Sequence, residues 1–434
     1  MCMRYLSMSE KSEFLIARIL RVNLRVVAMV IAVLAYACLG SPTPDTLSWV
    51  EVFVGGVLVF AVGVAAFRHV FFSFSEGRHV GAWFVVGQMF LIVGLVSGVC
   101  GALVSDASFM AIMRDVLPFG FLFLPLFLLG LNKRLGFERI YLTAFLCLGV
   151  IFALRAGGAG VGGAFMPSFI AGGEALYYLG NSPAVLFLAL FGLGCAMEVL
   201  SRGVGVRSLV VAVICLAGCA AAVLPIVMTA QRASMAAIVV YGIVVFGVLF
   251  MRYPRRMLFV GTGFGVFVAF AFGGFLLDAY EGVVSKSSLV GANMRAEEWA
   301  AVWGQISQHP LTLIFGRGWG AFFASPAVAD IEVSYTHSLL SMMLLKIGVL
   351  GFGLCVLYIG ALFLALLRCF RGGEVLVLAL AAPLLIDVFL YAAYKSLDFG
   401  LLLGMISVVI LRDSKISRIA SDAPLLYENS KGVT

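Results

Sequence analysis

The stretch HSLLSMMLLKIGVLGFGLCVLYIGALFLALL, residues 337–367, decides the fold. It carries one permanently charged side chain, that of Lys346, in a run longer than the roughly 20 residues a helix needs to cross the hydrocarbon core of a bilayer. A water-soluble domain has no surface on which to place so long an apolar helix. We therefore expect this stretch to span a membrane, with His337 at one end.

The rest of the chain has the same character. Of its 434 residues, 63% are hydrophobic and 12% are charged, and so few charges do not cover the surface of a soluble protein of this length. The sequence predicts an all-α polytopic membrane protein with about 12 transmembrane helices. The predicted spans are 22–40, 48–67, 80–104, 112–131, 139–155, 183–200, 208–228, 233–251, 256–277, 337–367, 375–394 and 398–411.

The hydrophilic joints between these runs alternate in charge. Joints such as NKRLGFER (132–139) and MRYPRR (251–256) are basic, and together with both tails they hold most of the 29 Lys and Arg residues. Positive charge is retained on the cytoplasmic side of a membrane, so we expect both termini in the cytoplasm. The net charge of +7 then reflects the orientation of the chain in the membrane. We expect the protein to contact membrane lipids and not nucleic acid.

This topology places one large loop on the outer face. Residues 1–277 hold nine spans, 278–336 form the loop, 337–412 hold three more spans, and 413–434 form a cytoplasmic tail. Within the loop, Asn293–Gln308 has apolar residues at helical spacing and predicts an amphipathic helix on the membrane surface, ended by Pro310. We place its apolar face on Met294, Trp299, Val302, Trp303 and Ile306 and its polar face on Glu297, Glu298 and Gln305.

Three arginines lie on the outer side, where the charge rule disfavours them. Arg295 and Arg317 are in the loop, and Arg232 begins an apolar helix within TAQRAS (229–234). A guanidinium offers a fork of donors that matches a phosphate or a carboxylate. Pairing with loop acids or lipid headgroups is the alternative. We predict that these three residues bind a phosphate group.

His337 is the candidate general base, because it opens an apolar helix at the outer interface and a neutral imidazole accepts a proton near pH 7. No zinc-type spacing of His, Cys or acidic residues occurs, so we expect neither a metal nor another cofactor. For Lys346 and Asp387, which lie at similar depths in neighbouring spans, we expect a buried ion pair with a structural role.

Four pieces of the sequence resemble the superfamily of O-antigen ligases and O-antigen polymerases. Arg295 precedes a Trp-containing helix, QHP (308–310) is followed by FGRGWGAF (315–322), and Arg232 stands beside a small residue at a helix start. The most specific piece is His337-Ser338, followed nine residues later by GVLG (348–351), which is similar to the ligase branch. The resemblance is clear over about 295–351.

The resemblance implies a bundle like that of the GT-C glycosyltransferases, in a bacterial inner membrane with the active site facing the periplasm. It implies metal-independent transfer of a glycan from undecaprenyl diphosphate to a sugar hydroxyl of lipid A–core, as in lipopolysaccharide biosynthesis. His337 is then the catalytic base, and Arg232, Arg295 and Arg317 bind the diphosphate. Direct attack on the anomeric carbon inverts it.

Two other functions fit the same pattern. A polymerase of the superfamily uses a second lipid-linked repeat unit as the acceptor. A transporter of lipid-linked oligosaccharides also has many spans and outer arginines, but transporters often show internal repeats and charges near the membrane midplane. This chain has no evident repeat, and its polar residues gather toward one face.

Overall fold

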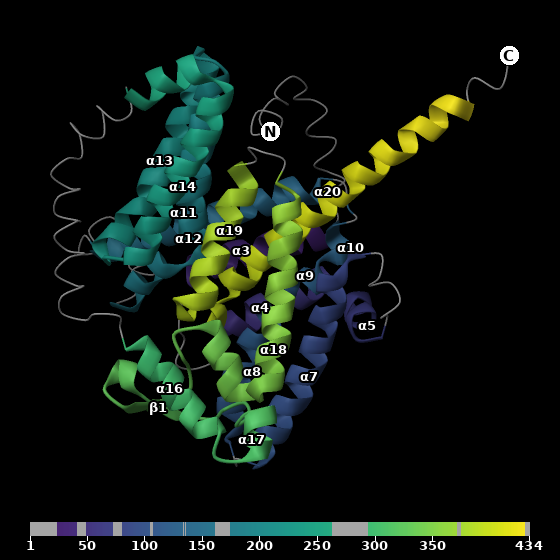
Figure 1. The fold of residues 1–434 in the computed structure, drawn as a ribbon, viewed down its shortest axis with the longest axis vertical. Helices are drawn as coiled ribbons and strands as arrows, with labels where there is room; N and C mark the ends of the chain where they lie inside the picture. The colour runs from purple at the N-terminus through teal and green to yellow at the C-terminus, as the bar shows by residue number, and fades with distance from the viewer. Residues whose placement is uncertain are drawn as a thin grey trace.

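The computed structural model describes residues 24–40, 49–72, 80–104, 107–132, 134, 136–160, 174–262, 294–370 and 375–429. These residues are mostly helical, and the described helices pack side by side into an elongated bundle (Figure 1). Its longer helices, in chain order, are α3 (Leu24–Leu39), α4 (Trp49–Val62), α5 (Val64–Phe72), α7 (Ala82–Val104), α8 (Phe109–Phe121), α11 (Phe137–Gly160), α12 (Pro183–Arg202), α13 (Val206–Met228), α14 (Arg232–Arg252), α18 (Leu339–Arg368), α19 (Val375–Phe389) and α20 (Leu397–Asn429).

Within the described residues, six helices are long and apolar enough to cross a membrane, or seven if the bent pair α4 and α5 forms one span. The all-α membrane character is confirmed, whereas the count of 12 is not. The pair α4 and α5 bends by 74° at Gly63, whose φ of +80° suits glycine. The predicted span 112–131 is divided among α8, α9 (Leu124–Phe127) and α10 (Leu129–Asn132).

The remaining differences concern length and coverage. α19 has 15 residues and rises about 22 Å, which is less than a core of about 30 Å. Residues 263–293, which hold most of the ninth predicted span (256–277) and the first part of the predicted loop, lie outside the described residues. α20 continues from its predicted span through the predicted tail as far as Asn429.

Helices α13 and α14 show which surface faces the lipid. α12 is largely buried, whereas α13 and α14 expose many branched apolar side chains. Soluble proteins rarely expose so continuous an apolar surface. The exposed side chains include Leu209, Val210, Val213 and Ile214 of α13 and Val239, Val240 and Ile243 of α14.

The residues between 294 and 336 form a compact segment beside the N-terminal end of α18, and we call it the 294–336 segment. It contains α16 (Arg295–Ile306), α17 (Pro310–Phe315), β1 (Phe323–Ser325), η2 (Pro326–Val328) and β2 (Ile331–Val333). β1 and β2 pair antiparallel, with Phe323 opposite Val333. This segment and the C-terminal end of α20 lie at opposite ends of the molecule (Figure 1).

A break in α18 joins this segment to the bundle. At Gly348 the backbone leaves helical geometry (φ 70°, ψ −164°), which frees carbonyl groups in the preceding turn. The N–H of Arg317 donates to the carbonyl of Leu345 at 2.8 Å, and the N–H of Gly318 donates to that of Lys346 at 3.0 Å. A side chain at Gly316 would meet the backbone of Ile347 at 2.4 Å, so this close approach requires glycine.

The predicted ion pair between Lys346 and Asp387 is wrong. The ammonium of Lys346, which is 0% exposed, lies 2.6 Å from Asp115 Oδ2 on α8 and also donates to the carbonyl of Ala321. The same carboxylate oxygen accepts the N–H of Gly320 at 2.7 Å. Asp387 is buried on α19, and among the described residues its Oδ2 has no hydrogen-bond partner. Matching depths in the membrane did not determine which neighbour the lysine faces.

Candidate functional site

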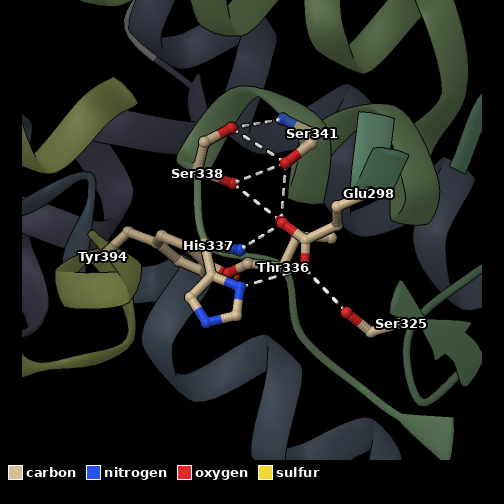
Figure 2. Close-up of polar contacts among 7 residues, drawn as sticks. All are labelled: Glu298, Ser325, Thr336, His337, Ser338, Ser341 and Tyr394. Atoms are coloured by element: carbon tan, nitrogen blue, oxygen red, sulfur yellow. Dashed lines mark hydrogen bonds and ion pairs between the residues drawn. The ribbon is translucent and has the colours of Figure 1, made fainter. Parts of the chain in front are cut away.

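The centre of the candidate site is a contact between Glu298 of α16 and His337, shown in Figure 2. The imidazole Nδ1 lies 3.0 Å from Glu298 Oε1, and the backbone N–H of His337 donates to Oε2 at 3.0 Å. The hydroxyl of Ser325 donates to Oε1 at 3.0 Å. Burial raises the pKa of the Glu298 carboxyl, but the hydrogen bonds from His337 and Ser325 outweigh burial, so the pKa lies below its usual value.

This geometry assigns the protons of the imidazole. An ionised carboxylate accepts hydrogen bonds and donates none, so Nδ1 of His337 carries a proton toward Glu298. In a neutral ring, Nε2 then holds a lone pair and is available as a base. Figure 2 shows this second nitrogen directed away from the carboxylate. The half-buried ring is therefore oriented in the way that catalytic bases are oriented by a carboxylate.

Hydrogen bonds on the other side of His337 fix the backbone that carries it. Ser338 is the N-cap of α18, and its Oγ accepts the N–H of Ser341 at 3.1 Å. The Ser341 hydroxyl donates to Thr336 Oγ1 at 2.8 Å, and the Tyr394 hydroxyl donates to the Thr336 carbonyl at 3.1 Å. His337 thus lies just outside the helix that it was expected to open, in a backbone held from both sides (Figure 2).

The expected faces of the amphipathic helix need correction. α16 forms within the predicted range, but Glu298 is 1% exposed, and it lies on the buried face with Val302 and Ile306. Met294 and Trp303, which we had placed on the apolar face, are exposed. The spacing of four residues between Glu298, Val302 and Ile306 indicates that they share one face of the helix. We had assigned Glu298 to the polar face because it is charged.

Two of the predicted arginines lie near this contact. Arg295 is the first residue of α16, and Arg232 is the first residue of α14. Burial lowers the pKa of the Arg295 guanidinium, Tyr391 and Glu298 raise it, and the positive charge of Arg232 lowers it further. These effects place Arg232 and Glu298 each within electrostatic range of the Arg295 guanidinium. Among the described residues, the Arg295 guanidinium makes no hydrogen bond.

Arg317 lies apart from this pair. Its guanidinium donates to Gln305 Oε1 at 2.8 Å, and its backbone N–H binds the carbonyl of Leu345, about 9 Å along the helix axis from the first residue of α18. Its charge acts on Lys346. Its predicted role in binding a diphosphate stays a prediction.

The candidate site combines a base with the guanidinium of Arg295, which lies within electrostatic range of Arg232. His337 is able to take a proton, and Arg232 and Arg295 are able to stabilise negative charge that develops close by. No group of three His, Cys, Asp or Glu side chains in the described part of the chain is placed to hold a metal ion. Comparison with known protein families and with curated proteins found no match for this chain.

Proposed function

We propose that this protein is an O-antigen ligase, an inverting glycosyltransferase that moves a glycan from undecaprenyl diphosphate to a sugar hydroxyl of lipid A–core. One observation carries the chemistry: Glu298 orients His337 so that Nε2 is available as a base, beside the guanidinium of Arg295. The resemblance of the His337-Ser338 motif to the ligase branch gives the substrate class. The apolar helices support a location in a membrane, which is where a polyprenyl donor resides.

In this reaction Nε2 of His337 removes the proton of the acceptor hydroxyl. The hydroxyl oxygen forms a bond to the anomeric carbon of the glycan while the bond from that carbon to the diphosphate oxygen breaks, and the configuration inverts. Arg295 and Arg232 stabilise the negative charge that the departing diphosphate gains. Glu298 stabilises the imidazolium that His337 becomes.

The test is a transfer assay with the purified protein in detergent. We expect incubation with an undecaprenyl-diphosphate-linked glycan and lipid A–core to give a joined product, seen as a shift of lipid A–core on a gel. A product only when a second lipid-linked repeat unit is the acceptor would identify a polymerase instead. Movement of the lipid-linked glycan across sealed vesicles with no joined product would identify a transporter and contradict the proposal.

The two arginines give a second test of the same chemistry. Arg232→Lys and Arg295→Lys each retain the charge but lose the planar fork that binds a phosphate through two hydrogen bonds. We expect each change to lower transfer by about 10- to 100-fold, the effect of losing one charge-assisted hydrogen bond. The measurement is the initial transfer rate at saturating lipid A–core.

Arg412→Lys is the matched control, because Arg412 on α20 pairs with Glu138 at 2.8 Å, away from the site. It should transfer at the wild-type rate. Full activity of both site variants would show that neither guanidinium binds the diphosphate through its fork.

A further inference from the structure

A third cation lies beside the site, and it has no acidic partner in the part of the chain that the structure describes. Lys395 ends η3 (Ala392–Lys395), the short helix between α19 and α20, and its ammonium is 3.4 Å from the centroid of the Tyr335 ring. Lys395 is half-buried, and among the described residues it makes no hydrogen bond and lies within ion-pair distance of no carboxylate. Contact with an aromatic face offsets part of the cost of removing a cation from water, but leaves all three donors unused.

The charges around Lys395 explain why none of the described side chains pairs with its ammonium. The acid that acts on Lys395 is Asp115 of α8, and that carboxylate is already bound to Lys346 and to the N–H of Gly320. Lys346 and Arg114 repel the ammonium. Burial lowers the pKa of Lys395 to about 7, because the attraction of Asp115 does not overcome burial and the two neighbouring cations. The neighbourhood therefore has more positive than negative charge.

Lys395 is also tied to the candidate base. The ring of Tyr335 lies 6.0 Å from the imidazole of His337, centroid to centroid, so the ammonium and the base lie against the same aromatic ring. The Tyr394 hydroxyl, from the residue before Lys395, donates to the Thr336 carbonyl, from the residue before His337. This hydrogen bond holds η3 against the backbone next to His337, one residue before Lys395 on one side and one residue before His337 on the other.

We propose that Lys395 receives an anionic group, a phosphate or a carboxylate carried by one of the two substrates, next to His337. The inference rests on the proposed function, because that function brings anionic substrates to this face. A diphosphate lipid is the source if the group belongs to the donor, and a phosphorylated sugar or an acidic sugar of the core is the source if it belongs to the acceptor. The ammonium is a binding group in either case and is not the base.

The expected signature is proton uptake on binding. The ammonium is neutral in a growing fraction of free protein as pH rises above about 7, whereas the bound anion keeps it protonated. Affinity should be constant below that pH and fall by up to about tenfold for each pH unit above it. The other charged and titratable groups that act on this ammonium or lie against it are Arg114, Asp115, Tyr335 and Lys346, together with His337 against the same ring.

The experiment compares Lys395→Gln and Lys395→Arg with the wild-type full chain in detergent. Binding of undecaprenyl diphosphate and, separately, of lipid A–core is measured by thermophoresis between pH 6.5 and pH 9. For one ligand we expect the wild-type affinity to fall by about 10- to 100-fold across this range. Lys395→Gln should bind that ligand weakly at pH 6.5 without the same fall. Lys395→Arg should bind tightly at both ends, because arginine stays charged.

Every other titrating group is retained in both variants, so the difference between the pH profiles isolates the lysine. The ligand that shows the difference identifies the source of the anion. If the wild type binds either ligand and Lys395→Gln has the same affinity and pH profile, the inference about Lys395 is wrong while the proposed function stands. If the wild type binds neither ligand, the proposed function fails and the role of Lys395 falls with it.

Discussion

His337→Ala is expected to lower the rate of glycan transfer by about 10²–10⁴-fold, the usual contribution of a general base. The substitution removes the only group at the centre of the site that is oriented to accept a proton from the acceptor hydroxyl, among the residues that the structure describes. The rate is measured with purified protein, and thermal unfolding in the same detergent shows that the variant is folded. Retention of more than about a tenth of the wild-type rate would show that His337 is not the base.

Glu298→Gln tests the same contact from its other side. The amide has the shape of the carboxylate, but it neither stabilises the imidazolium nor enforces one tautomer, and the corresponding change in a serine protease costs about 10⁴-fold. We expect a loss of about 10²-fold or more. Glu297→Gln is the matched control, because Glu297 is the neighbouring residue on α16 and is exposed. Equal rates for the two glutamine variants would remove Glu298 from the mechanism.

Lys346→Met is expected to destabilise the protein by about 3–5 kcal/mol, because it leaves the buried carboxylate of Asp115 without its cation. Asp115→Leu should cost a similar amount, since it strands the ammonium and also removes the acceptor of the Gly320 N–H. Combining the two changes should recover part of the loss, because the double variant buries no unpaired charge. The measurement is unfolding by heat or denaturant in detergent micelles.

Asp387→Leu combined with Lys346→Met is the control for this cycle. Asp387 is not in contact with Lys346, so the two effects should add without recovery. Recovery with Asp387→Leu and none with Asp115→Leu would restore the pairing expected from depth alone and contradict the structure.

Hydropathy located the helices well where a single apolar run forms a single straight helix. The predicted spans 183–200, 208–228 and 233–251 differ from α12, α13 and α14 by at most two residues at either end. It failed where the run bends. Gly63 turns one run through 74°, and the predicted span 112–131 is divided among three short helices, because hydropathy reports burial but carries no information on backbone direction.

The polar residues likewise divide into those that the sequence indicated and those that it did not. His337 and Arg232 stood out in the sequence because polar residues at the ends of apolar helices are few, and Arg295 stood out because the charge rule disfavours arginine on the outer side. Glu298 and Asp115 did not, because a carboxylate looks the same in a sequence whether water or a buried cation surrounds it. Their partners lie 39 and 231 positions away along the chain, and only the folded arrangement brings them together.

The break at Gly348 has a consequence for how the chain is made. The N–H groups of Arg317 and Gly318 bind carbonyls of α18, a helix that is synthesised after them. Until α18 is made, these two N–H groups lack their acceptors, and the 294–336 segment contacts only helices made before it, such as α7 and α8. Its final shape therefore waits for insertion of the next helix. A nascent chain stopped before residue 345 would present this segment open to proteases, and one that includes the whole of α18 would protect it.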